Sequence, residues 1–143
     1  MFSRLNFQYL LSYFGLIPYF LILIDKYFLN QIKEQISINF LIYYTLIIFV
    51  FIGSINWNFD NKTNNFITIY GFLPSFFATF IIILNLYSFN FFYLILIINL
   101  LLVIQLIFDY FVIFLRKPDK NFLYFLRIPL TLSIIFSLLI FIT

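Results

Sequence analysis

Five stretches of about 20 apolar residues, separated by short polar breaks, dominate this chain. A bilayer core ~30 Å thick needs about 20 apolar residues per helix, so each stretch is long enough to cross a membrane. None of them alternates with the period of two that a membrane β-strand requires. We therefore predict an all-α integral membrane bundle of five transmembrane helices, forming a single domain over residues 1–143. The predicted spans cover about residues 7–24, 38–57, 66–86, 91–115 and 122–142.

The composition agrees with a membrane location. Hydrophobic residues make up 65% of the chain and charged residues 9%, whereas soluble domains carry about 25% charged residues. A soluble fold needs polar side chains to cover its surface, and this chain has too few. Its 24 Phe residues are better explained by an AT-rich genome than by a ligand-binding cage.

Missing residue types exclude several kinds of chemistry. The chain contains no Cys and no His, which excludes disulfides, thiolate nucleophiles, His-ligated metals and a Ser-His-Asp triad. Its five acidic residues are scattered along the sequence, which argues against a carboxylate metal cage. We expect a protein that is not an enzyme, holds no metal or cofactor, and binds no nucleic acid.

Lysine and arginine are distributed unevenly between the two membrane sides, and cytoplasmic loops carry the excess of these residues. The side of the N-terminus collects Arg4, Lys62, Arg116, Lys117 and Lys120, and the opposite side has Lys26 and Lys33. The bias predicts an N-terminus inside and a C-terminus outside. We expect the first span to be retained, because no small-x-small cleavage site follows it.

The connection between the first two spans is the only loop with a pattern. Phe28, Ile32 and Ile36 recur every four residues, which suits a short interfacial helix. A lengthened second span is an equal alternative.

Small residues and prolines mark where helices bend or approach one another. Gly15 with Pro18, and Pro74 in the third span, predict bends that neighbouring helices accommodate. Gly53 predicts a close helix contact, and Trp57 predicts an anchor at the membrane interface. Gly15-x-x-Pro18 and Gly71-x-x-Pro74 share a spacing, which would fit a duplicated pair of parallel helices, as in some transporters. In so biased a composition, coincidence is the better explanation.

The polar residues inside the predicted spans form the candidate site. Lipid offers no hydrogen-bond partners, so such side chains are costly unless other groups of the protein bind them. Asn85, Asn99 and Gln105 predict interhelical hydrogen bonds, and Gln105 shares a helix face with Asp109 four residues later. Asp109 precedes the loop at 116–120 by seven residues, and Arg127 follows it by seven. We therefore expect an ion pair between the fourth and fifth spans. The alternative is an Arg127 that reaches the headgroups beside a protonated Asp109.

Four motifs, in order, resemble the transmembrane protein 69 family of small bacterial and mitochondrial membrane proteins. They are Gly15–Phe20, Tyr43-Tyr44 followed by Phe51–Trp57, Leu73–Phe76, and Gln105 and Asp109 with the run Phe122–Arg127. Ser54 and Asn58 stand where the family usually has glycine. The resemblance implies an architecture and no reaction.

Two classes of function fit these features. The first is a scaffold, accessory or assembly component of a larger respiratory-type complex, with lipid and other membrane subunits as partners. The second is a small transporter or proton conductor that uses Asp109, Gln105 and Arg127. Arg116, Lys117 and Lys120 are positioned to contact anionic lipid. We expect a bacterial inner membrane or a mitochondrial inner membrane.

Overall fold

The computed structural model of the chain describes residues 4–54, 65–116 and 123–143, and this part is helical with no strand. Five of its helices are long and apolar enough to cross a membrane. Their spans are Tyr9–Leu29, Glu34–Ser54, Thr68–Leu86, Phe91–Phe111 and Leu123–Ile142. The prediction of an all-helical membrane protein with five such helices is confirmed, and the boundaries differ from the predicted ones by a few residues.

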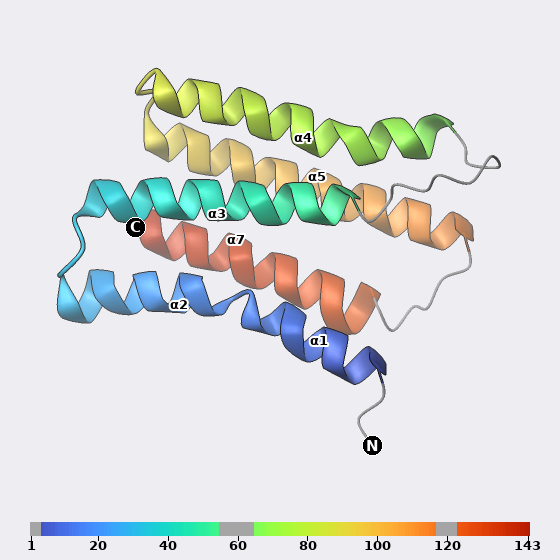
Figure 1. The fold of residues 1–143 in the computed structure, drawn as a ribbon, viewed down its shortest axis with the longest axis horizontal. Coiled ribbons are helices and arrows are strands. Elements are labelled where there is room, and N and C mark those ends of the chain that lie inside the picture. The colour runs from blue at the N-terminus through green and yellow to red at the C-terminus, as the bar shows by residue number, and fades with distance from the viewer. Residues whose placement is uncertain (1–3, 55–64, 117–122) are drawn as a thin grey trace. The chain divides into compact units, whose positions relative to one another are not determined.

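The chain divides into two compact units, and two long helices contribute to both: the first turn of α3 (Glu34–Ser54) belongs to the first unit, and α5 (Phe91–Arg116) is divided between the two. The first unit comprises residues 1–37 and 106–143. It contains α1 (Arg4–Phe14), α2 (Ile17–Ile24), the π-helix η1 (Asp25–Leu29), the end of α5 (Phe91–Arg116), the π-helix η2 (Leu123–Arg127) and α7 (Ile128–Ile142). Figure 1 shows α2 beside α7 in this unit.

The first span is interrupted where the sequence predicts a bend. α1 ends at Phe14, and α2 begins at Ile17 with Pro18 in its first turn. Pro18 has no N–H to bond the carbonyl of Phe14, so the α-helical hydrogen bond is lost at this point. The N–H of Gly15 instead bonds the Ser12 carbonyl at 3.1 Å, which tightens the chain between the two helices.

No interfacial helix forms between the first two spans. The first span continues as η1 to Leu29. The second span, α3 (Glu34–Ser54), begins four residues before the predicted residue 38, which agrees with the alternative of a lengthened second span. Asn30 adopts a left-handed conformation with φ 50°, which asparagine tolerates better than most residues. The buried carboxylate of Asp25 accepts the backbone N–H groups of Gln31 and Ile32 at 3.2 and 3.1 Å. These bonds hold residues 30–33 as a turn.

The second unit comprises residues 38–105 and contains most of α3, α4 (Asn65–Leu86) and the first part of α5. A four-residue turn joins α4 to α5, with Ser88 at φ 57°. The side chain of Asn90 accepts the N–H of Phe92 at 2.9 Å and so caps α5 at its start. Figure 1 shows α3 and α4 running side by side along this unit.

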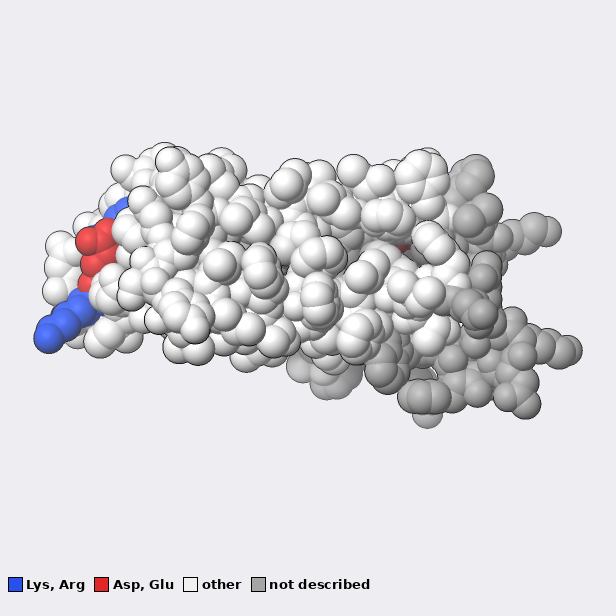
Figure 2. Space-filling view, turned by 90° about the horizontal axis from the view of Figure 1, so that it is seen from above, with Lys and Arg blue, Asp and Glu red and all other residues white. Residues whose placement is uncertain are grey.

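Charged side chains are nearly absent from the face drawn in Figure 2, where red and blue atoms gather at one end of the described surface. Asp25 and Lys26 of η1, Lys33 of the following turn and Glu34 at the start of α3 lie close together in the sequence here. Large apolar side chains are exposed along the described spans, as with Phe51 and Phe136, each 65% exposed or more. Such a surface suits contact with lipid or with other membrane helices.

Candidate functional site: polar side chains within the spans

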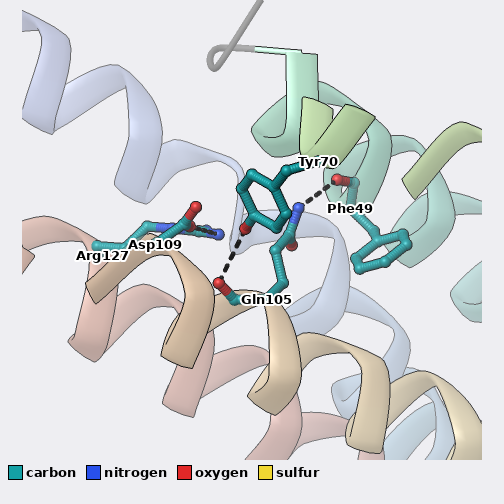
Figure 3. Close-up of polar contacts among 5 residues, drawn as sticks. All are labelled: Phe49, Tyr70, Gln105, Asp109 and Arg127. Carbon is teal, nitrogen blue, oxygen red and sulfur yellow. Dashed lines mark hydrogen bonds and ion pairs between the residues drawn. The ribbon is translucent and has the colours of Figure 1, made fainter. Parts of the chain in front are cut away.

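The structure brings Asp109 of α5 and Arg127 of η2 into contact in the first unit (Figure 3). Arg127 Nε donates to Asp109 Oδ2 at 2.6 Å, and Arg127 Nη2 contacts the same carboxylate oxygen. Both side chains are only 6% exposed. A lone charge at the centre of a span costs at least ~2.5–3.5 kcal/mol, and opposite charges in contact reduce that cost. The pair therefore joins α5 to the start of the last span.

Gln105 lies one turn before Asp109 on α5, and its contacts belong to the second unit (Figure 3). Its side-chain Nε2 donates to the Phe49 carbonyl of α3 at 3.0 Å. The Tyr70 hydroxyl of α4 donates to the Gln105 backbone carbonyl at 3.1 Å. A single residue of α5 therefore connects three helices of this unit. Its Oε1 is buried and has no hydrogen-bond partner among the described residues.

Asn85 forms a second polar contact between α3 and α4. Its Nδ2 donates to the Tyr43 hydroxyl at 3.0 Å and to Asn39 Oδ1 at 3.3 Å. The expected interhelical hydrogen bonds are thus present at Gln105 and Asn85. Asn99 is different, because its amide nitrogen and oxygen are buried with no partner in the described part of the chain.

Gly53 lies against Pro74 in the second unit, where α3 and α4 cross closely. A Cβ built on Gly53 would lie 2.9 Å from Pro74 Cβ and closer still to Pro74 Cγ. Any side chain at position 53 therefore requires the helices to move apart. The sequence predicts a close contact at Gly53 but not that a proline ring fills it.

The other predicted packing residues occupy separate places. Gly15 lies in the turn between α1 and α2, and Pro18 lies in the first turn of α2. Pro74, by contrast, stands inside the uninterrupted helix α4. The two Gly-x-x-Pro segments therefore adopt different local structures. Trp57 lies outside the described residues.

The residues predicted to contact anionic lipid lie at the edge of the described part of the chain or outside it. Arg116 is the last residue of α5. Lys117 and Lys120 lie outside the described residues, as does the side chain of Arg116. The anionic-lipid contact stays a prediction.

The sequence did not predict the contacts between the first and last spans. In the first unit, Lys26 and Tyr27 of η1 donate to the carbonyls of Phe141 and Ile140 at the end of α7, the latter at 2.9 Å. Lys26 Nζ also lies 4.7 Å from the centre of the Phe141 ring, within reach of a cation–π interaction. From the sequence, Lys26 contributes only to the charge bias that predicts the orientation. Its place at the end of a span, where helix carbonyls lack donors, was the available signal.

The described polar groups inside the spans can form hydrogen bonds and one ion pair. No group of three or more His, Cys, Asp or Glu residues that could hold a metal occurs among the residues searched. The arrangement provides contacts between helices and two buried carboxylates among the described residues, those of Asp25 and Asp109. No protein-family model, no curated protein and no solved structure matches this chain.

Proposed function

We propose that the protein is a non-catalytic integral membrane protein that serves as a scaffold, accessory or assembly component of a larger membrane complex of respiratory type. One observation carries the proposal. The polar groups that the structure brings together inside the spans, at Asp109–Arg127, Gln105 and Asn85, contact other helices of the same chain. Its exposed described surface along the spans is apolar and aromatic, which suits lipid and neighbouring subunits. The motif resemblance to the transmembrane protein 69 family is part of this proposal.

The membrane and the orientation belong to the same proposal. A bacterial inner membrane or a mitochondrial inner membrane would hold the chain with its N-terminus in the cytoplasm or matrix. The excess of Lys and Arg on that side supports this orientation. Anionic headgroups would then lie near Arg116, Lys117 and Lys120.

Purification from native membranes tests the scaffold. The tagged chain, extracted in a mild detergent, is separated on a native gel, and each band is identified by mass spectrometry. We expect the chain to co-purify with membrane subunits in a fixed ratio. A matched sample in a harsh detergent, which separates subunits but leaves single bundles folded, should release the chain alone. Migration as a single chain in the mild detergent would contradict the proposal.

A proton-flux assay distinguishes the alternative, transport through Asp109, Gln105 and Arg127. The purified chain is placed in liposomes that contain a pH-sensitive dye, with the Asp109→Asn variant as the matched control. We expect flux no greater than that of empty liposomes for both proteins. Proton flux through the natural chain that is lost in a folded Asp109→Asn variant would contradict the scaffold proposal. It would instead support a proton conductor.

A further inference from the structure

The first and last spans of the first unit are joined by side-chain donors on one span and backbone carbonyls on the other. Near one end the Tyr13 hydroxyl of α1 donates to the Phe125 carbonyl, and near the other Tyr27 donates to the Ile140 carbonyl. The donors are 14 residues apart and the acceptors 15, which correspond to about 20 Å along each helix. The two spans therefore run parallel and in register.

Free carbonyls at the end of a helix are expected, since the last four lack donors within the helix. Ile140 and Phe141 belong to that group because α7 ends at Ile142. The Phe125 carbonyl is not one of these helix-end carbonyls, because Phe125 lies at the start of the span. Its carbonyl is the acceptor that an α-helix would pair with the N–H of residue 129, and residue 129 is proline, which has no N–H.

Proline also explains the shape of this turn. In an α-helix the ring of Pro129 would collide with the carbonyl four residues earlier, that of Phe125. The chain forms the π-helix η2 directly before it, and π turns relieve such collisions in membrane helices. Arg127 is the last residue of η2 and is buried against Asp109. The same short turn thus places an arginine and presents a carbonyl whose α-helical donor is missing.

We propose that Pro129 and Tyr13 act as a matched pair that sets the first turn of the last span. The proline opens this turn into η2 and removes the N–H that an α-helix would direct at the Phe125 carbonyl. The Tyr13 hydroxyl takes the place of the missing N–H. Tyr13 of α1 and Asp109 of α5 both contact η2. Together they fix this turn in place and keep Arg127 in contact with Asp109.

Energetic coupling between residues 13 and 129 tests the proposal. We expect Tyr13→Phe to lower the Tm of the natural chain by about 2–4 °C, the loss that follows from one hydrogen bond of ~1 kcal/mol. In a Pro129→Ala background the backbone N–H at position 129 is restored, so Tyr13→Phe should leave the Tm unchanged. Tyr27→Phe is the matched control, because its partner at Ile140 does not involve Pro129, and it should cost the same in both backgrounds.

Amide hydrogen exchange provides a second measurement that needs no change at Pro129. Tyr13→Phe should speed exchange about fivefold across residues 123–128, the factor for the loss of ~1 kcal/mol of local protection. Tyr27→Phe should leave those amides unchanged. Equal losses of Tm from Tyr13→Phe in both backgrounds, or unchanged exchange in Tyr13→Phe, would overturn the matched pair.

Discussion

Gly53 of α3 lies directly against the ring of Pro74 in α4, so a glycine and a proline together allow two spans to approach closely. A Cβ at position 53 would lie 2.9 Å from Pro74 Cβ, a separation that real Cβ atoms do not adopt. In lipid, close packing of this kind is a main source of attraction between helices. The contact therefore contributes to the stability of the second unit through shape rather than through polarity.

Gly53→Leu should destabilise the protein strongly, because the leucine side chain must push α3 away from α4. Overpacking of a close contact costs about 1–3 kcal/mol, and the four atoms added here place the result at or above that range. Thermal unfolding in detergent measures the loss. Ser54→Leu is the matched control, since Ser54 is exposed on the next position of the same helix. A Gly53→Leu protein with the stability of the natural chain would contradict the close contact.

The buried pair between Asp109 and Arg127 predicts a strong non-additive effect. Asp109→Asn leaves Arg127 buried without its opposite charge, and Arg127→Gln does the same to Asp109. Each single change should cost about 3–5 kcal/mol of unfolding free energy. The double change should cost less than the sum, because it leaves no charge stranded. Additive losses would indicate that the two charges act independently.

The spans could be predicted because long apolar runs interrupted by charges leave little choice of boundaries. Counting from the charged loop at 116–120 also gives similar depths for Asp109 and Arg127, and the structure places their side chains in contact. Antiparallel helices joined by a short loop pack side by side, so local geometry is sufficient there.

Contacts between spans distant in sequence could not be predicted in the same way. Nothing local to Gly53 identifies Pro74 as its neighbour, because the rotation of each helix about its axis depends on the whole unit. The bonds from Tyr13 and Lys26 require the first and last spans to pack in parallel, 112 and 115 residues apart in sequence. The two π-helices could not be predicted either, because the apolar pattern does not distinguish a π turn from an α turn.

Asn85 and Asn99 should respond oppositely to replacement by leucine. Asn85→Leu loses hydrogen bonds to Tyr43 and Asn39, worth ~0.6 kcal/mol each on average, and should lower stability. Asn99→Leu removes an amide that is buried without a partner among the described residues. Since such an amide costs ~1–3 kcal/mol, this change should raise the unfolding free energy. Denaturation of both variants in the same detergent makes the comparison, and a destabilised Asn99→Leu protein would reveal a partner for this amide.

The parallel first and last spans bear on the orientation of the chain. Tyr13 bonds the start of the last span and Tyr27 bonds its end, so both spans begin at the same end of the first unit. Arg4 precedes the first span, and the charged run from Arg116 to Lys120 precedes the last. We therefore predict that these basic residues share one membrane side, which by the positive-inside rule faces the cytoplasm or matrix.

Cysteine labelling measures this orientation directly, because the natural chain contains no cysteine that would react. Single cysteines are introduced as Ser3→Cys and Thr143→Cys, and intact cells are treated with a membrane-impermeant maleimide. With an odd number of spans, only one of the two positions is reachable from outside, and we expect it to be position 143. Lysis before labelling is the control, since it should make both positions react. Reaction at position 3 and protection at position 143 in intact cells would reverse the orientation, and reaction at both would contradict five membrane crossings.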